Sequence, residues 1–454
     1  MGKKFDFDYT IIGSGPAGTT AALILAKNKK KKIALVEGRS YGGSNLNTRD
    51  VPYLVSLDFA HNFYSLKDSP ELNGQDPHYN FPTITMHQEK IALSLGAGDK
   101  KLYENAGITC IDGFANFLDE NTIAIGDQKI TSDYFILATG ASLDKGHIVG
   151  LDSVDYFTPD TIIKIRRQPK FILVVGGGST GCEIAEYFAK LGTKVILMES
   201  NARILPKEDK EVSDALRDYF ERELGIMIME NCKVVEITND ETAKRVVFTT
   251  DGQEKMIHID CIVLATGSHP RVNYGLENAG VKFSKTGILV DKFFQTSARN
   301  IFAIGDCVSN NSSTERAEYE ASVLADNLLH KAKTPIIHSG FARITATEPE
   351  IATVGKTEAT LIKNKIKYNT AIIYLKDISA SKIYHQNYGF VKIITDGSGR
   401  IIGSTIMAPH ASLMISELAI AVRHHLTALE IASTPHIANN FGYAIKLAAK
   451  KLAK

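Results

Sequence analysis

The sequence predicts an α/β protein in which two similar strand–helix–strand units are followed by a separate α+β domain. The spacing G-x-G-x-x-G occurs twice, from Gly13 to Gly18 and from Gly176 to Gly181, each time directly after a short apolar strand. After Lys333 the pattern changes to closely spaced strands followed by helices. With 454 residues, the chain is also too long for one ordinary hydrophobic core.

The first unit contains every part of a dinucleotide-binding fingerprint. An expected strand at 9–12 leads into the glycine motif, an apolar helix follows at 19–26, and a second strand at 32–36 ends at the acidic residue Glu37. A carboxylate at that place can accept hydrogen bonds from ribose hydroxyls. The first unit therefore predicts a dinucleotide site.

Each glycine of the motif has a separate task in this context. Gly13 permits the tight turn, Gly15 lets the backbone approach a pyrophosphate, and Gly18 lets the helix pack closely against the strand. The pyrophosphate would lie at the helix N-terminus, where unpaired N–H groups and the helix dipole favour an anion.

The second unit repeats the pattern. Strands at 171–175 and 194–198 flank a helix at 182–190, and the second strand ends at Glu199. One such motif is a weak signal, but two in the same context, each with its terminal acid, strongly indicate two dinucleotide sites. Glu199 favours NADH, because a carboxylate accepts from a 2′-hydroxyl and repels a 2′-phosphate, whereas the nearby Arg203 leaves NADPH as the less favoured alternative.

Further strands and helices complete the expected architecture. Two buried strands end in Ala-Thr-Gly turns, at 135–140 and 262–267, and another apolar strand ends at Asp306. Small residues at such turns let the chain pass close to a bound nucleotide. The C-terminal region is expected to contain strands at 351–354, 368–374, 389–394 and 401–407 and helices at 411–424 and 427–432.

Composition and charge exclude several classes of protein. The apolar fraction of 44% fits a globular chain, and 52 basic against 51 acidic residues leave no single-sign field that would favour nucleic acid. The basic run from Lys29 to Lys32 lies between a helix and a strand and is expected to be a solvated loop. No apolar run approaches the ~18 residues of a membrane span, and no signal pattern is present, so we expect a cytoplasmic protein without a membrane span.

The five cysteines fit neither a disulfide framework nor a zinc site, because their number is odd and no two are closely spaced. Cys307 follows Asp306 and Cys182 follows Gly181, and both are expected to be small buried residues. A redox role for either thiol stays open at this stage. No metal ligands are expected.

The chain resembles the class I pyridine nucleotide-disulfide oxidoreductases, which include dihydrolipoamide dehydrogenase, glutathione reductase, mercuric reductase and soluble transhydrogenase. The resemblance rests on both fingerprints, both Ala-Thr-Gly turns, and the segments 296–306, 341–355 and 389–393, so it covers essentially the whole chain. It implies FAD on the first unit, a nicotinamide dinucleotide on the second, and a homodimer formed by the C-terminal domain. The implied domains are FAD-binding (1–150, completed by 271–333), NAD(P)-binding (151–270) and dimerisation (334–454).

The fingerprints and the resemblance together imply a set of cofactor-binding residues. They are Gly13, Gly15, Pro16, Ala17, Gly18, Glu37, Gly43, Ser44, Thr139, Gly140, Gly176, Gly178, Gly181, Glu183, Glu199, Gly267 and Asp306. By the same resemblance, Asp306 would bond the ribityl chain of FAD. The helix that begins near Thr314 would direct its N-terminus at the flavin pyrimidine, where it favours negative charge on the reduced ring.

The chain departs from the family at the redox-active disulfide. The family motif G-G-T-C-x-N-x-G-C-x-P-S-K matches the stretch that begins at Gly42, and its two cysteine positions are Asn45 and Asp50. The lysine that ends the motif is Leu54, so the matching family glutamate, Glu183, would need another partner. Asp50 is either a proton donor or a brake on the reduced flavin, or an ordinary polar replacement.

The C-terminal acid–base pair is also replaced. The family motif H-x-H-P-T-x-S-E matches the stretch that begins at His436, with Ala438 at the catalytic histidine and Tyr443 at the glutamate. His436 itself is expected to be structural. A thiolate is what attacks a disulfide and a histidine manages its proton, so neither step of dithiol chemistry has its residue here.

The sequence therefore favours an FAD-dependent NAD(P)H oxidoreductase whose acceptor needs no protein thiol. That acceptor could be a quinone, a second nicotinamide, oxygen, a metal ion or a small redox protein. Two alternatives are a non-catalytic FAD- and NAD-binding redox sensor or scaffold, and a dihydrolipoamide dehydrogenase, which the overall resemblance suggests and the replaced residues oppose.

Overall fold

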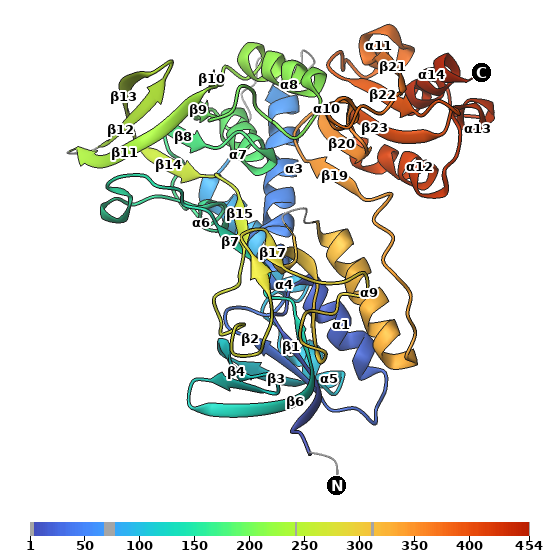
Figure 1. Ribbon diagram of the computed structural model, residues 1–454. Coiled ribbons are helices and arrows are strands. Elements are labelled where there is room, and N and C mark those ends of the chain that lie inside the picture. Colours follow the sequence, from blue (N-terminus) through green and yellow to red (C-terminus); the bar gives the residue numbers. More distant parts are fainter. Residues whose placement is uncertain (1–3, 68–77, 241–242, 310–312, 454) are drawn as a thin grey trace.

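Three main sheets with their helices, and three smaller antiparallel sheets, make up the fold in the computed structural model, which describes residues 4–67, 78–240, 243–309 and 313–453 (Figure 1). The N-terminal sheet lies at the bottom of the view, the middle sheet at the upper left and the C-terminal sheet at the upper right. The predicted fold class, two Rossmann-type units plus a C-terminal α+β domain, is confirmed.

The N-terminal sheet has the strand order β3-β2-β1-β6-β5-β4, and β18 pairs with β6. Its central strands are parallel, as expected when helices cross over between them. The strands are β1 (Phe7–Ile12), β2 (Ile33–Glu37), β3 (Thr109–Asp112), β4 (Ala115–Asp119), β5 (Thr122–Ile125), β6 (Gln128–Leu137) and β18 (Ile301–Ala303).

Helices α1 (Pro16–Ala26) and α9 (Thr314–His330) pack against each other beside this sheet. Their contact is made largely by alanines, such as Ala21 on α1 and Ala321 on α9, which lie in one buried cluster. Small side chains let the two helices approach closely. The connection from β2 to β3 contains α2 (Gly43–Asn47), α3 (Asp50–Lys67), α4 (Phe81–Ser94) and α5 (Lys101–Asn105).

The middle sheet is a parallel sheet with the order β10-β9-β8-β14. Helices α7 and α8 cover one face, and the antiparallel sheet β11-β12-β13 packs on the other. The elements are α6 (Pro159–Ile162), β8 (Phe171–Val175), α7 (Ser179–Lys190), β9 (Lys194–Met198), α8 (Lys210–Arg222), β10 (Met227–Met229), β11 (Cys232–Asp240), β12 (Ala243–Thr250), β13 (Gln253–Ile259) and β14 (Cys261–Leu264). Short pairs β7 (Ala141–Leu143) with β15 (Ser268–Pro270), and β16 (Phe283–Ser284) with β17 (Gly287–Ile288), complete the connections.

The C-terminal sheet is antiparallel, with the order β19-β20-β23-β22-β21. Helices α12 and α14 cover one face, while residues of the other face, such as Phe390 and Met407, belong to the same core as α7 and α8. The elements are β19 (Ala342–Thr345), β20 (Glu350–Gly355), α10 (Glu358–Lys363), β21 (Asn369–Tyr374), α11 (Ser379–Ile383), β22 (Phe390–Thr395), β23 (Ile401–Ala408), α12 (Ala411–His424), α13 (Ala428–Ser433) and α14 (Tyr443–Leu452).

Helix α3 runs between these parts of the molecule (Figure 1). Its buried residues include Tyr53, Leu57 and Ala60, which pack with α4 and α7 in one core. The residues around the start of α3 therefore lie where the units meet. No helix among the described residues is both long enough and apolar enough to cross a membrane.

Candidate functional site

The first glycine motif adopts a conformation that only glycine accommodates easily. Gly13 has φ +102°, and a Cβ added to it would lie 2.3 Å from the carbonyl oxygen of Ala138. A Cβ on Gly18 would lie 1.8 Å from the carbonyl oxygen of Gly13. At Gly15, in contrast, no atom of the described residues, its chain neighbours aside, lies within 4 Å of such a Cβ. The space in front of the α1 N-terminus is therefore open to a ligand.

Glu37, at the end of β2, is held in place by the same loop. One of its carboxylate oxygens, Oε2, accepts hydrogen bonds from the backbone N–H (2.9 Å) and the hydroxyl (2.6 Å) of Ser14. The other, Oε1, accepts from the backbone N–H of Arg39 at 2.8 Å. These bonds fix the orientation of a half-buried carboxylate beside the open turn, as a ribose-binding acid requires.

The other residues expected to bind FAD surround this turn. Pro16 and Ala17 form the first turn of α1, and a Cβ on Gly43 would lie 2.6 Å from the Cα of Gly15. Ser44 is exposed in the first turn of α2. Thr139, Gly140 and Asp306 follow the adjacent strands β6 and β18 at the same edge of the sheet.

The second glycine motif repeats this geometry on the middle sheet. Gly176 has φ +108°, and a Cβ on Gly181 would lie 1.8 Å from its carbonyl oxygen. In the part of the chain that the structure describes, and apart from the neighbouring residues, no atom lies within 4 Å of a Cβ added to Gly178 or to Gly267. The N-terminus of α7 is therefore open in the same way as the N-terminus of α1.

Glu199 follows β9 and is buried. Its Oε2 accepts from the backbone N–H of Gly177 at 2.8 Å, and its Oε1 accepts from the backbone N–H (2.7 Å) and the side-chain amide (2.6 Å) of Asn201. Arg203 donates from Nη2 to the carbonyl oxygen of Glu208 at 3.0 Å, and its buried Nε has no hydrogen-bond partner among the described residues. The carboxylate, and not the guanidinium, is thus fixed next to the open helix terminus.

The two cysteine positions of the family motif carry side chains that touch. The side-chain amide of Asn45 donates to Oδ2 of Asp50 at 2.7 Å and to the hydroxyl oxygen of Thr314 at 2.9 Å. The Thr314 hydroxyl donates in turn to the same Asp50 oxygen at 2.6 Å. Because Thr314 is the first residue of α9, this triangle lies at the helix N-terminus that was expected to face the flavin.

Glu183 lies in α7 without the lysine that its family counterpart has. Its Oε1 accepts from the backbone N–H of Ala346 at 2.9 Å, and Leu54, at the lysine position, is 55% exposed. Burial raises the pKa of the Glu183 carboxyl to about 7. The charge of Arg49 lowers the pKa of Glu183, but its guanidinium is bound to Asp160 at 2.6 Å.

Ala438 and Tyr443 occupy the positions of the family histidine and glutamate, and both lie in the C-terminal domain. Ala438 is exposed, and Tyr443 begins α14, where its N–H donates to the side chain of Asn440 at 3.1 Å. His436 contacts the carbonyl oxygen of Thr434 through Nδ1 at 2.9 Å and Glu417 through Nε2 at 3.0 Å. These contacts agree with the structural role expected for His436.

Comparison with known protein families shows which family shares the two glycine-motif units and the C-terminal domain. A model described as "Pyridine nucleotide-disulphide oxidoreductase" matches residues 7–321, and its dimerisation domain matches residues 341–449. The chain belongs to the pyridine nucleotide-disulphide oxidoreductase family. This is a family of FAD-dependent pyridine nucleotide oxidoreductases, so FAD and a nicotinamide dinucleotide are its expected cofactors.

Individual members of the family match along almost the whole chain. A mercuric reductase of Streptomyces lividans is 29% identical over 98% of this chain and 96% of its own length. A dihydrolipoyl dehydrogenase of Staphylococcus aureus is 30% identical with the same coverage. The structure of the HOCl-induced flavoprotein disulfide reductase RclA from Escherichia coli superposes with a TM-score of 0.86 at 22% identity, covering 98% of this chain and 99% of that protein, which shows the shared fold.

None of the five cysteines of this family member forms a disulfide in the described structure. Cys307 is fully buried, its thiol donates to the carbonyl oxygens of Leu137 and Ile304, and burial raises its pKa to about 12. Cys182 is also fully buried, and burial raises its pKa well above the usual value. Its place in the first turn of α7 therefore does not yield a reactive thiolate.

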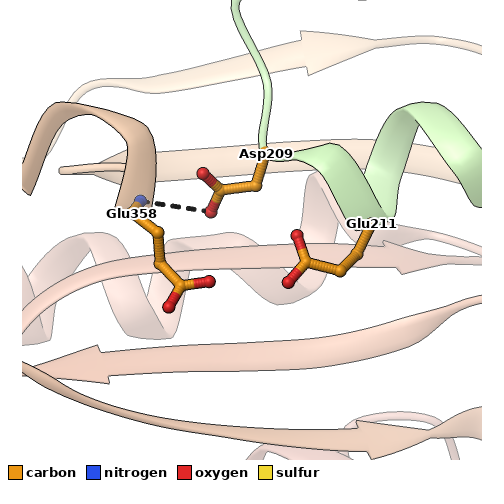
Figure 2. A group of neighbouring side chains, drawn as sticks. All are labelled: Asp209, Glu211 and Glu358. Atoms are coloured by element: carbon orange, nitrogen blue, oxygen red, sulfur yellow. Dashed lines mark hydrogen bonds between the residues drawn. The ribbon is translucent and has the colours of Figure 1, made fainter. Parts of the chain in front are cut away.

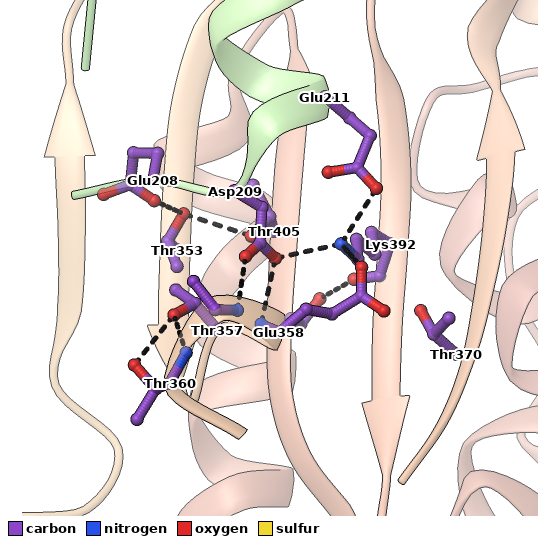
Figure 3. A network of polar contacts seen from close by, with 12 residues as sticks. Glu208, Asp209, Glu211, Thr353, Thr357, Glu358, Thr360, Thr370, Lys392 and Thr405 are labelled. Carbon is purple, nitrogen blue, oxygen red and sulfur yellow. Dashed lines mark hydrogen bonds and ion pairs between the residues drawn. The ribbon is translucent and has the colours of Figure 1, made fainter. Parts of the chain in front are cut away.

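Three carboxylates outside the glycine motifs could suggest a metal site. Asp209, Glu211 and Glu358 direct their side chains toward one another between α8 and α10 (Figure 2). However, the ammonium group of Lys392 from β22 lies among them and bonds to all three (Figure 3). The buried ammonium group therefore occupies the place that a metal ion would take, and its charge offsets one of the three carboxylate charges.

Sequence reasoning identified the glycines and the two strand-terminal acids, but not the residues that hold them. Ser14 and Asn201 orient the two acids, and Arg49 enters the site in place of the family glycine between the cysteine positions. A serine inside a glycine motif is a local sequence signal for a hydrogen bond to the acid at the end of the next strand. The contact of Asn45 with Thr314 spans 269 positions and leaves no local signal.

Proposed function

We propose that the protein is an FAD-dependent NADH oxidoreductase that passes electrons to an acceptor without a protein thiol. The observation that carries this proposal is the hydrogen-bonded triangle of Asn45, Asp50 and Thr314. An amide and a carboxylate occupy the places where the family carries its redox cysteines, and neither side chain can form or break a disulfide. The open glycine turns and the hydrogen-bonded acids on both sheets, in contrast, support the binding of two dinucleotides.

The residues of the N-terminal sheet fit FAD. The open Gly15 turn and the α1 N-terminus would hold the pyrophosphate, Glu37 would accept from the ribose, and Asp306 would bond the ribityl chain. FAD supplies a ring that takes a hydride from a nicotinamide and releases two electrons to an acceptor. The chain from 1 to 150 and from 271 to 333 would form the FAD-binding domain.

The residues of the middle sheet fit NADH better than NADPH. The Gly178 turn would receive the pyrophosphate, and Glu199 would accept from the 2′-hydroxyl of the adenosine ribose. Residues 151–270 would form this NAD-binding domain, and residues 334–454 would join two copies into a homodimer.

Anaerobic reduction followed by turnover tests the proposal. NADH should bleach the flavin absorbance faster than NADPH, and a panel of quinones, dyes, a nicotinamide analogue, ferric complexes and oxygen should identify the class of acceptor. Flavin that binds but is never reduced by NADH would contradict the oxidoreductase and favour the redox sensor.

A dithionite titration tests the absence of thiol chemistry separately. The flavin should bleach with two electrons per chain, because no second redox pair stores electrons beside it. Lipoamide and glutathione disulfide should not be reduced. Uptake of four electrons, or a long-wavelength thiolate-to-flavin absorbance band, would show a dithiol that the Asn45 and Asp50 positions do not provide.

A further inference from the structure

Glu183 lies where three parts of the fold meet. It is on the second turn of α7, its carboxylate accepts from the Ala346 N–H just after β19, and it faces the junction of α2 and α3. The side chain is half-buried, and no ion pair to it is found in the part of the chain that the structure describes. Burial of a carboxylate without a bound cation disfavours its charged form.

The positively charged side chain that acts on Glu183, that of Arg49, is already paired with another carboxylate. The guanidinium of Arg49 bonds to Asp160 at 2.6 Å, and Thr48 donates to the same oxygen at 3.0 Å. Position 54, where the family carries a lysine, is Leu54 in this chain, so its side chain contributes no charge. Among the described residues, the polar contact of the Glu183 carboxylate is the hydrogen bond that it accepts from the backbone N–H of Ala346.

The ionisable groups around Glu183 act in opposite directions. Asp50 and Glu186 add to the effect of burial and raise the pKa of Glu183 to about 7, while Arg49 and the Ala346 N–H lower it. The surrounding groups come from the start of α3, from α6 and from α7. They are Arg49, Asp50, Tyr53, Asp160, Cys182 and Glu186.

We propose that Glu183 binds a proton from solution in step with reduction of the flavin. This inference rests on the proposed function, which brings FAD and NADH together at this junction. A hydride from NADH leaves NAD⁺ and adds one negative charge to the flavin ring. Once NAD⁺ has left, the ionised Glu183 carboxylate takes up one proton from the solvent, so the combined charge of the flavin and Glu183 is the same as before reduction. A lysine at position 54 would remove the need for that proton, and this chain has none.

Potentiometry at a series of pH values counts the protons. The flavin midpoint potential of the holoprotein is measured around pH 8, about one unit above the Glu183 pKa of about 7. The slope for the wild type should correspond to two protons per two electrons. The isosteric Glu183→Gln variant should give one proton per two electrons. In infrared difference spectra, a protonated-carboxyl band should appear when the wild type is reduced and should be absent from this variant.

Three further variants sharpen the experiment. Glu89→Gln removes an exposed carboxylate paired with Arg166 and should keep the wild-type slope. Asp50→Asn should keep the infrared band, which assigns it to Glu183 and not to Asp50. Leu54→Lys returns a cation to the family position and should reduce the uptake to one proton.

The possible results separate the inference from the proposed function. A wild-type slope of one proton, or equal slopes for the wild type and Glu183→Gln, overturns the role of Glu183. Because the electrode reduces the flavin directly, this holds even for a chain that NADH does not reduce. A holoprotein that NADH fails to reduce contradicts the proposed function, and a chain that binds no flavin contradicts both.

Discussion

Helix α1 approaches its own strand so closely that a Cβ on Gly18 would lie 1.8 Å from the carbonyl oxygen of Gly13. Gly15, three residues earlier, faces open space. The second motif has the same division between Gly181, which is packed, and Gly178, which is open. One glycine of each motif thus serves the fold and another serves access to the ligand.

The two kinds of glycine should respond differently to alanine. Gly15→Ala should leave the fold intact, at a cost of about 1 kcal/mol for a poorer helix cap, but lower FAD content, because the new methyl group lies where the pyrophosphate would lie. Gly18→Ala should destabilise the fold itself, because its Cβ meets backbone. Flavin content and urea unfolding measure the two effects. Equal loss of stability in both variants would contradict this division.

Nicotinamide choice should depend on the charge of Glu199. Glu199→Gln removes the charge that repels a 2′-phosphate, so the preference for NADH over NADPH should fall by about tenfold, or ~1.4 kcal/mol. The ratio of kcat/KM values for the two nucleotides measures this change. Glu221→Gln, on the exposed side of α8, is the matched control and should keep the wild-type ratio. An unchanged ratio in Glu199→Gln would mean that another residue selects the nucleotide.

The C-terminal domain should carry the dimer contact. Leu413 on α12 is 75% exposed and Ile437 is 77% exposed. Large exposed apolar side chains on a domain that matches a dimerisation domain are candidates for burial in the contact between two copies. Leu413→Asp should shift the protein from dimer to monomer at micromolar concentration in light scattering. Met256→Asp, on β13 and also exposed, should remain dimeric. A wild-type monomer at that concentration would rule out the expected assembly.

Stability should depend strongly on the buried ammonium group of Lys392. Replacement by methionine keeps much of the volume but leaves Asp209 and Glu358 facing each other without a cation, which should cost about 3–5 kcal/mol. Urea unfolding of Lys392→Met against the wild type measures the loss. A difference below about 1 kcal/mol would show that the three acids are neutralised in another way.

The sequence was most informative where function depends on backbone shape. Glycine motifs, strand-terminal acids and apolar strands have fixed local spacing, so β8 and α12 were predicted with their observed bounds. The long helices α3 and α4, the antiparallel sheet β11-β12-β13 and the C-terminal helix α14 were not predicted. Their residues pack against distant segments, and that packing rather than local spacing fixes them.

The candidate site shows the same division. Glu183 could be recognised by its match to a family position, but its partner could not, because the Ala346 N–H lies 163 residues away. Likewise, Asn45 and Asp50 could be seen to replace cysteines, whereas their contact through Thr314 depends on how α9 meets α2. Pairings between distant segments are a property of the packed fold.

The burial of the cysteine thiols limits their reaction with electrophiles, peroxides and soft metal ions. Four of the five side chains are buried, the fifth is half-buried, and burial raises the pKa values of Cys261 and Cys307 to about 12. At neutral pH these two groups are uncharged and out of reach of electrophiles, peroxides and soft metal ions, all of which attack exposed thiolates. An enzyme with a redox disulfide becomes poisonable each time it is reduced, because reduction exposes two thiols. Under the proposed function, this chain would hold its flavin reduced without offering such a target.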